Sequence, residues 1–299
     1  MPYMVAGKLK NEISFKPCPD SNQISLPCGQ CIGCRLEKSR QWAVRCMHEA
    51  QLHENNCFIT LTYDEENLKS RSLDKTDFQK FLKRFRKSIA PAKIRYYMAG
   101  EYGSKFGRPH FHACIFGYDF HDKKLFKRTP SGSLIYRSKN LEKLWTYGYS
   151  SIGDVTFESA AYIARYIMQK YNGEMDRNNT HITREEHYTY CDLSTGELIK
   201  LEPEYNKMSL KPGIGAEWLK KYRSDVYPND YVVINGKKTK PPRYYDKIQQ
   251  IDYPFEYEEI SHNREKTAKL RHEDNTLDRL AAKEQVTKAK LQLLKRTLT

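Results

Sequence analysis

The segment RPHFHACIFG, residues 108–117, places two histidines on either side of a single phenylalanine. Its apolar residues and the flanking glycines predict a β-strand over residues 109–117. Successive side chains of a strand point to opposite faces. One face then carries Phe111, Ala113 and Ile115, and the other carries His110, His112 and Cys114. We expect the apolar face to pack on helices, which leaves the histidine face available for chemistry.

A carboxylate precedes this strand at a position from which it can reach the same face. Glu101 closes a second predicted strand, IRYYMAGE (residues 94–101), and a glycine-containing connection joins the two strands. An antiparallel partner brings the Glu101 side chain near His110. Two imidazoles and one carboxylate could hold Mg²⁺ or Mn²⁺ and leave coordination positions open for a phosphate. Two alternatives remain, an ordinary strand segment and the similar ligand set of non-haem iron oxygenases.

Two tyrosines four residues apart form the second candidate group. Tyr162 and Tyr166 lie in AAYIARYIMQKY (residues 160–171), which predicts a helix, and this spacing puts both phenols on one helix face. A tyrosine hydroxyl that attacks a DNA phosphate forms a phosphotyrosine bond and frees a 3′-hydroxyl, so the strand can later be rejoined. Lys170 lies on the same face and Arg165 is adjacent, where either could stabilise charge. The alternative is an amphipathic helix whose tyrosines pack in the core.

Composition favours a polyanionic partner. The chain has 299 residues, a net charge of +14, and 22 tyrosines against 3 tryptophans. An excess of lysine and arginine commonly marks nucleic-acid binding, and interleaved tyrosines suit base stacking. The basic charge and the tyrosine pair argue against the oxygenase alternative. No apolar run approaches the roughly 20 residues of a membrane helix, and the N-terminus lacks the apolar core of a signal peptide, so we expect a soluble cytoplasmic protein.

Five of the eight cysteines suggest a second metal site near the N-terminus. Cys28, Cys31 and Cys34 form a C-x2-C-x2-C run, and either Cys18 or Cys46 could complete a tetrahedral zinc site. Zinc would stabilise a loop-rich segment that has little core of its own. An iron–sulfur cluster and a set of buried or free thiols are the alternatives.

Two basic stretches could contact the DNA backbone, with an affinity that falls as the salt concentration rises. The first lies on a helix predicted between Asp74 and Pro91 and comprises Lys80, Lys83, Arg84, Arg86 and Lys87. The second comprises Lys237, Lys238, Lys240 and Arg243, beside Tyr244 and Tyr245. Solvated surface charge without a ligand is the alternative for both.

The remaining segments complete the predicted element order. Strands are expected at residues 58–63 and 149–157, and helices near residues 34–54, 139–146, 158–171 and 215–223. Residues 118–135 read as irregular, and residues 172–207 as loops with at most a hairpin. Asn235-Gly236 predicts a tight turn. The chain from about residue 256 is charged and helix-prone, with leucines at heptad spacing that suggest either a coiled-coil seam or one amphipathic helix.

Taken together, these motifs resemble those of HUH rolling-circle replication endonucleases of the two-tyrosine type. Four segments resemble replication proteins of the gokushovirus branch of the Microviridae, which are small single-stranded-DNA bacteriophages. The segments are PCGQCIGCRLEKSRQWAVRC, FITLTYDEENL, GEYGSKFGRPHFHACIFG and MSLKPGIG. The resemblance covers residues 15–220. It implies His110 and His112 as metal ligands, Tyr162 and Tyr166 as nucleophiles, and Lys170 as their assisting lysine. Glu101 as third ligand is an extrapolation from its position. Many relatives have a lysine beside the tyrosines where this chain has Arg165.

The resemblance also implies a fold and an activity. The fold would be α+β, a ferredoxin-like HUH palm with a central antiparallel sheet, over residues 58–225. A cysteine-rich segment (residues 1–57) would precede it, and a basic arm with a helical extension (residues 226–299) would follow. The protein would nick single-stranded or melted origin DNA in the cytoplasm of a bacterial host, start rolling-circle replication, and rejoin the displaced strand into a circle. The resemblance also implies a host replication protein such as a helicase as a partner. The alternatives are a plasmid relaxase or transposase of the same chemistry, or a non-catalytic zinc-stapled DNA-binding protein.

Overall fold

The computed structural model describes most of the chain. The described residues are 3–5, 12–14, 23–25, 27, 29, 31–68, 70–103, 107–166, 184–192 and 195–293, with the backbone alone for 3–5, 12–14, 23–25, 165, 166 and 184. The chain divides into two compact units, residues 1–38 with 271–294, and residues 39–270 with 295–299. The second unit contains the large sheet and the two candidate metal ligands His110 and His112. The functional boundaries at residues 57/58 and 225/226 stay a prediction.

The large unit is built on a seven-stranded antiparallel sheet, so the predicted α+β class is confirmed. The strand order is β12-β5-β6-β4-β9-β8-β7, and every neighbouring pair is antiparallel. The strands are β4 (Asn56–Tyr63), β5 (Arg95–Tyr102), β6 (Pro109–Phe116), β7 (Lys124–Arg128), β8 (Leu134–Arg137), β9 (Gly148–Gly153) and β12 (Tyr205–Met208). Helix α2 (Lys75–Ser88) connects β4 to β5, and α3 (Lys139–Leu144) lies between β6 and β9. The order β5-β6-β4-β9 with these two helices is the ferredoxin-like βαββαβ arrangement.

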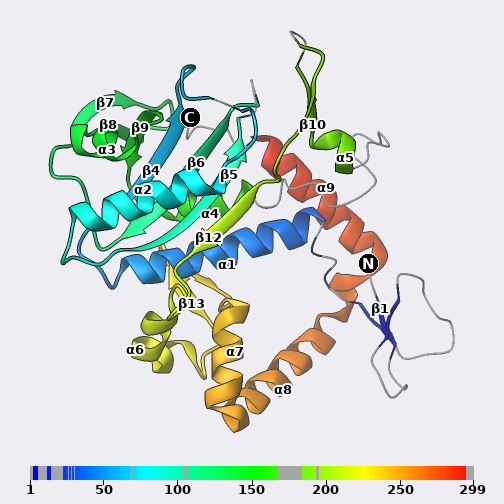
Figure 1. Ribbon diagram of the computed structural model, residues 1–299. Helices are drawn as coiled ribbons and strands as arrows, with labels where there is room; N and C mark the ends of the chain where they lie inside the picture. Colours follow the sequence, from blue (N-terminus) through cyan, green and yellow to red (C-terminus); the bar gives the residue numbers. More distant parts are fainter. Residues whose placement is uncertain are drawn as a thin grey trace. The chain divides into compact units, whose positions relative to one another are not determined.

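One face of the sheet packs on α2, as the alternation in β6 predicts (Figure 1). Phe78, Phe81, Leu82 and Phe85 of α2 share a core with Phe111, Ala113 and Ile115 of β6. Leu141 of α3 and Trp145 belong to the same core. Asp74 caps α2 by accepting a hydrogen bond from the Thr76 backbone N–H, which confirms it as the N-cap.

The opposite face of the sheet, which carries the histidines, is covered by helices as well. Helices α1 (Ile32–Ala50) and α4 (Phe157–Tyr166) pack there, and the Ser39 hydroxyl donates to the Ala161 carbonyl oxygen at 2.8 Å. The reason is that this face carries large apolar side chains too. Phe58, Tyr97, Cys114 and Phe116 form a second core with Ala43, Cys46, Ala160, Ile163 and Ala164. The histidines therefore lie at one end of a buried layer.

Two elements differ from the sequence prediction around β9. The strand ends at Gly153 and not at residue 157, because the Thr156 and Ser159 side chains cap α4. Residues 118–135, predicted as irregular, contain β7 and lead into β8. All five residues of β7 are exposed, so no burial alternation marks this edge strand in the sequence.

A third core lies between α1 and the segment after residue 210. Helices α6 (Ala216–Val226), α7 (Arg243–Asp252) and α8 (Pro254–Leu270) bury Trp218, Tyr227 and Tyr245 there. A hairpin of β13 (Val232–Ile234) and β14 (Lys237–Thr239) turns at Asn235 and Gly236, whose φ values of 50° and 74° confirm the predicted tight turn.

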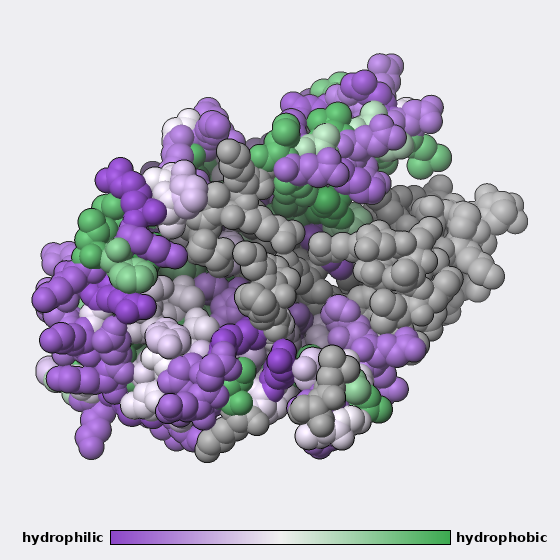
Figure 2. Space-filling view, turned by 90° about the horizontal axis from the view of Figure 1, so that it is seen from above, coloured by the Kyte–Doolittle hydropathy of each residue, from purple (hydrophilic) through white to green (hydrophobic). Residues whose placement is uncertain are grey.

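The remaining described elements are short, apart from one helix. They are β1 (Tyr3–Val5), β2 (Glu12–Ser14) and β3 (Gln23–Ser25), α5 (Arg184–His187), the hairpin of β10 (Thr189–Cys191) and β11 (Leu198–Lys200), a 3₁₀ turn (His272–Asn275), and α9 (Leu277–Leu293). The helix-prone character of the C-terminal segment is confirmed, but the prediction of one continuous amphipathic helix is wrong, because a 3₁₀ turn separates α8 from α9 and Leu270 and Leu277 of the heptad series are exposed. Hydrophilic residues predominate on the described part of the face in Figure 2. No helix in the described ranges has the length and apolar character needed to cross a bilayer.

Candidate active site

Glu101, His110 and His112 converge at the end of the β5–β6 hairpin. Glu101 pairs with His110 in the strand register, as the hairpin geometry predicts. Its Oε1 lies 2.7 Å from His110 Nε2 and 2.9 Å from His112 Nε2. The two rings are perpendicular, with centroids 4.9 Å apart. All three ligand atoms lie within 4.8 Å of one another, so one cation could contact them together. Neighbouring ligands of an octahedral Mg²⁺ lie about 3 Å apart, which agrees with both carboxylate distances.

Hydrogen bonds on the far side of each ring orient the two imidazoles. His110 Nδ1 lies 3.0 Å from the Arg108 carbonyl oxygen, to which it donates, so Nε2 is the nitrogen that can hold a cation. His112 Nδ1 lies 2.9 Å from the hydroxyl of Thr60, its cross-strand neighbour on β4. Such outer contacts fix the tautomer of metal-binding histidines. The sequence prediction missed Thr60, because its role depends on the register between two strands that are fifty residues apart.

The site is buried, and the pKa values of its two histidines shift in opposite directions. The side chains of Glu101 and His112 are each 1% exposed, and that of His110 is 12% exposed. Burial lowers the pKa of His112, and Glu101 offsets this only in part. Burial also acts to lower the pKa of His110, but its hydrogen bond to Glu101 outweighs that effect and raises the pKa overall. One carboxylate thus serves two imidazoles of different basicity.

An incompletely satisfied carboxylate indicates that the residues fit a cation. Glu101 Oε2 is buried and has no hydrogen-bond partner among the described residues. A buried carboxylate oxygen without a partner is costly, and a bound cation would relieve that cost. Two nitrogen donors and one carboxylate suit a divalent ion of the first transition row as well as a hydrated Mg²⁺.

Tyr162 lies directly beside this group. Its ring, on α4, meets the His112 ring edge-on with centroids 5.2 Å apart, and Tyr162 is 8% exposed. Tyr166 is the last residue of α4, and its side chain and that of Arg165 lie outside the described residues, as does all of Lys170. The Tyr162 phenol and the His112 imidazole therefore meet on the same face of the sheet.

The cysteines fall into two groups. Cys46 is fully buried in the second core with Cys114, where its contact and burial raise the pKa of the Cys114 thiol. Burial likewise raises the pKa of Cys57. Cys34 and Cys46 are twelve residues apart on α1, a rise of about 18 Å. Thiolates of one zinc ion lie about 4 Å apart, so Cys46 cannot share a zinc ion with Cys34. Cys31 and Cys34 are accessible, and Cys18 and Cys28 lie outside the described residues.

The two basic stretches lie on different parts of the large unit. The basic residues of α2 belong to the helix on the opposite face of the sheet, and Arg84 there donates to the Leu144 carbonyl oxygen at 2.9 Å. Lys80, Lys83, Arg86 and Lys87 are exposed. Lys237, Lys238, Lys240 and Arg243 are exposed on and after the β13–β14 hairpin, which Arg40 of α1 holds through Thr239. No residue of the α2 stretch contacts the Glu101–His110–His112 group within the described part of the chain.

The fold and the site define an α+β protein with a palm of the HUH type, in which an antiparallel sheet presents two histidines and a glutamate beside a helical tyrosine. The family model for replication-associated protein ORF2/G2P matches residues 56–171. The chain belongs to the family of replication-associated proteins of Microviridae-like bacteriophages, which confirms the resemblance seen in its motifs.

Three relatives illustrate the similarity. Replication-associated protein VP4 of Bdellovibrio phage phiMH2K is 34% identical over 79% of this chain and 70% of its own length. Replication-associated protein ORF2 of Spiroplasma virus 4 is 30% identical over 82% and 74%, respectively. Replication-associated protein ORF4 of Chlamydia phage 1 is 28% identical over 75% and 53%. No solved structure matches the chain significantly.

Proposed function

We propose that this chain is a metal-dependent DNA strand transferase that nicks origin DNA, starts rolling-circle replication and rejoins the displaced strand into a circle. One observation carries the proposal, the 5.2 Å approach of the Tyr162 ring to His112 within the Glu101–His110–His112 group. The relatives' names, which assign them to phage replication, support the choice of DNA as substrate.

The nicking step exchanges one phosphodiester for another. The Tyr162 hydroxyl loses its proton as its oxygen attacks the scissile phosphorus and forms the phosphotyrosine bond. The bond to the 3′-oxygen of the preceding nucleotide breaks, and that oxygen takes up a proton, so the exchange is balanced. The phosphotyrosine holds the 5′ end, and the freed 3′-hydroxyl is the primer for synthesis. Attack by a later 3′-hydroxyl reverses the exchange, releases the tyrosine and closes the circle, so rejoining needs no nucleotide cofactor.

Glu101, His110 and His112 would hold the Mg²⁺ or Mn²⁺ ion. When bound, this ion supplies a Lewis acid that polarises a non-bridging phosphate oxygen. The chain's own contribution is to position the ligands. Thr60 and the Arg108 carbonyl fix the two ring orientations, and the cover of α1 and α4 keeps the layer beneath them dry.

The other proposed roles rest on sequence position. Tyr166, one helical turn after Tyr162, would perform the second transfer, and Lys170 with Arg165 would stabilise the phenolate or the phosphate. A zinc ion would be held by Cys18, Cys28, Cys31 and Cys34, without Cys46. The basic residues of the β13–β14 hairpin would contact the DNA backbone outside the site. A host replication protein such as a helicase remains a proposed partner.

The test is a search for the covalent product. Incubation with end-labelled single-stranded DNA and Mn²⁺ should give a protein–DNA species that survives denaturation. The double variant Tyr162→Phe/Tyr166→Phe should bind the DNA with unchanged affinity and form no adduct, because phenylalanine has no nucleophilic oxygen. Tyr253→Phe, at an exposed tyrosine beyond α7, is the matched control and should form the adduct normally.

Two outcomes would contradict the proposal. An adduct in the double variant would mean that another residue is the nucleophile. DNA binding by the wild type without any adduct would favour the non-catalytic DNA-binding alternative. A relaxase or a transposase shares this chemistry and would be separated from a phage initiator by the sequence that it cuts.

A further inference from the structure

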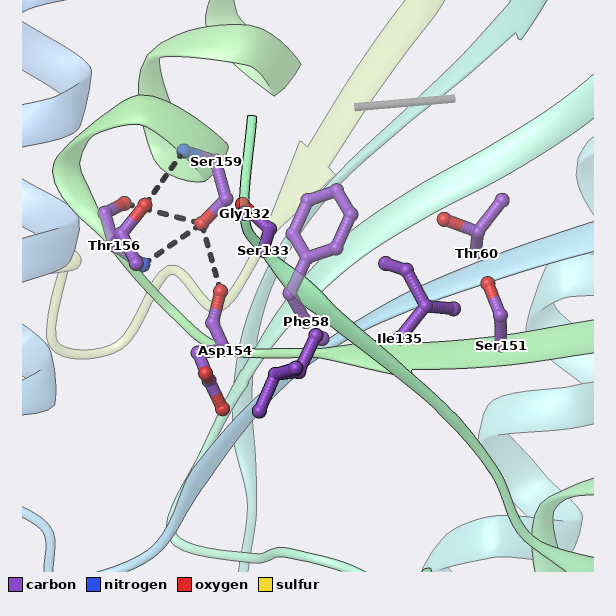
Figure 3. A pocket seen from close by; sticks show the side chains of 11 residues that line it. Phe58, Thr60, Gly132, Ser133, Ile135, Ser151, Asp154, Thr156 and Ser159 are labelled. Carbon is purple, nitrogen blue, oxygen red and sulfur yellow. Dashed lines mark hydrogen bonds between the residues drawn. The ribbon is translucent and has the colours of Figure 1, made fainter. Parts of the chain in front are cut away.

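A small cavity adjoins the candidate site on the histidine face of the sheet. Its volume is about 180 Å³, and it lies between β4, β8, β9 and the start of α4 (Figure 3). Apolar side chains from Phe58, Leu134 and Ile135 form part of its wall, and hydroxyls from Thr60, Ser133 and Ser151 form another part. Apolar walls with a few placed polar groups are typical of small-molecule sites.

Two residues belong both to the cavity and to the surroundings of the metal ligands. The Thr60 hydroxyl, which lines the cavity, is hydrogen-bonded to His112 Nδ1 at 2.9 Å. The Phe58 ring is stacked on the His112 ring with centroids 5.5 Å apart. The cavity therefore lies next to the metal ligands on this face of the sheet, separated from His112 by the side chains of Thr60 and Phe58.

The absence of a side chain at Gly153 helps to keep this space open. A Cβ at Gly153 would lie 3.8 Å from Ile135 Cδ1 and 3.9 Å from both Leu134 O and Phe58 Cδ1, so it would point among the cavity walls. The φ of Gly153 is not in the left-handed region, so the backbone itself does not require glycine. Beside it, the partly buried Ser151 side chain adds a hydroxyl to the cavity wall.

The lining favours an uncharged ligand over a phosphate. None of the described residues that line the cavity is a lysine, an arginine or a histidine, and Asp154 adds a carboxylate. The N-terminus of α4 offers no free anion site either. Thr156 N donates to the Ser159 hydroxyl at 2.8 Å, and Ser159 N donates to the Thr156 hydroxyl at 3.1 Å (Figure 3). A flat, uncharged nucleobase matches this combination of apolar walls and hydroxyls.

We propose that this cavity receives one unpaired base of the DNA strand, next to the phosphate that is held at the histidines. The inference rests on the proposed function, because it takes single-stranded DNA as the substrate. It adds a reason for that preference. A base can enter a cavity of this size only when it is neither stacked nor paired, so duplex DNA must be melted before it fits.

The test measures how much the bases contribute to binding when the cavity is filled. Gly153→Leu and Ser151→Leu each place a side chain in it, and Ser88→Leu, on α2 at the opposite face, is the matched control. Fluorescence anisotropy gives the affinity for a random-sequence 12-nucleotide pool and for a base-free 12-unit abasic backbone. The ratio of these affinities is the base-dependent part of binding, and it does not depend on cleavage or register.

We expect the ratio to fall about tenfold in both cavity variants, the loss typical of one removed base contact, and to stay unchanged in Ser88→Leu. Affinity for the base-free backbone should stay at the wild-type value in every variant, which also shows that the variants are folded. An unchanged ratio in a cavity variant that retains this backbone affinity would overturn the proposal. Two variants at different positions guard against misfolding of one.

The outcome is separable from that of the proposed function. A wild type that forms no covalent adduct, but whose base-dependent binding is lost in the cavity variants, would keep the cavity proposal and remove the nicking activity. If the wild type forms the adduct and neither cavity variant changes the ratio, the nicking activity is supported and the cavity proposal is overturned.

Discussion

The candidate metal ligands depend on a contact that the sequence does not display. His112 lies in a buried layer, and the Thr60 hydroxyl of the neighbouring strand is what determines which of its nitrogens faces Glu101. Without this contact the ring could present either nitrogen. Thr60 is thus a positioning residue, because it acts on a ligand and not on the substrate.

Replacement of Thr60 by valine should weaken metal binding. Thr60→Val keeps the shape of the side chain but removes the oxygen that accepts from His112 Nδ1, and loss of such an outer contact costs about tenfold or more in metal affinity. Calorimetric titration with Mn²⁺ in the absence of DNA measures this affinity. Thr267→Val, at an exposed position on α8, makes the same chemical change away from the ligands and should bind Mn²⁺ like the wild type. Equal Mn²⁺ affinities for all three proteins would show that Thr60 does not orient the ligand.

Among the elements, α2 and α4 lie on opposite faces of the sheet and have different relations to the site. Helix α4 carries Tyr162 to the histidines, whereas α2 packs its phenylalanines on the reverse of the histidine strand. The exposed lysines of α2 therefore face solvent on the side away from the Glu101–His110–His112 group. Exposed charges separated by more than the Debye length, about 8 Å at physiological ionic strength, interact little.

Charge reversal on α2 should consequently leave both the DNA affinity and the rate of adduct formation almost unchanged. In Lys83→Glu/Lys87→Glu we expect adduct formation at the wild-type rate, and affinity for a single-stranded 12-mer within about threefold of the wild type at 150 mM salt. Anisotropy titrations and the adduct assay measure both quantities. The matched variant Lys237→Glu/Lys238→Glu changes the same charge on the β13–β14 hairpin, where we propose backbone contacts, and should bind more weakly. A large loss in the α2 variant would mean that DNA passes over that face as well.

The extent to which sequence predicts these elements depends on how local their determinants are. The strand predicted over residues 109–117 and the cap at Asp74 have local determinants, and the structure confirms both, the strand as Pro109–Phe116. The edge strand β7 was missed because exposure on both faces removes the periodic signal. The cover over the histidine face was missed because Cys114 was grouped with the histidines as a chemical residue, whereas it packs as an apolar one. The cavity beside Gly153 requires three strands and a helix to be placed together, which no single segment encodes.

At the scale of the whole molecule, the C-terminal third of the large unit is joined to the sheet through α1. Buried residues of α1 take part in both the second core, with Ala43 and Cys46, and the third core, with Val44. His48 is fixed in the same region between aromatic rings. Its ring is stacked on Trp218 with centroids 3.4 Å apart, and its Nδ1 lies 2.9 Å from the Tyr245 hydroxyl. This packing leaves no room for the water that a charged imidazole needs.

Folding stability should therefore fall in mild acid because of His48. Burial lowers the pKa of His48 to about 3, whereas an unfolded histidine has a pKa near 6.5. Above pH 6.5 both states are neutral and the group contributes no pH dependence. Between about pH 6.5 and 3 the unfolded state binds a proton that the folded state excludes, so the free energy of unfolding falls by about 1.4 kcal/mol for each pH unit of acidification.

Urea unfolding at pH 7, 5.5 and 4.5 measures this slope. His48→Phe keeps the stacked ring but cannot be protonated. Its free energy of unfolding should therefore fall less steeply with acidification, with a slope smaller by about 1.4 kcal/mol per pH unit. Loss of the hydrogen bond to Tyr245 lowers its stability at pH 7 but does not affect this slope. His121→Phe replaces an exposed histidine and should keep the wild-type slope. A His48→Phe slope equal to that of the wild type would mean that the folded protein accommodates the charged imidazole, and that the junction between α1 and the third core opens more readily than its burial indicates.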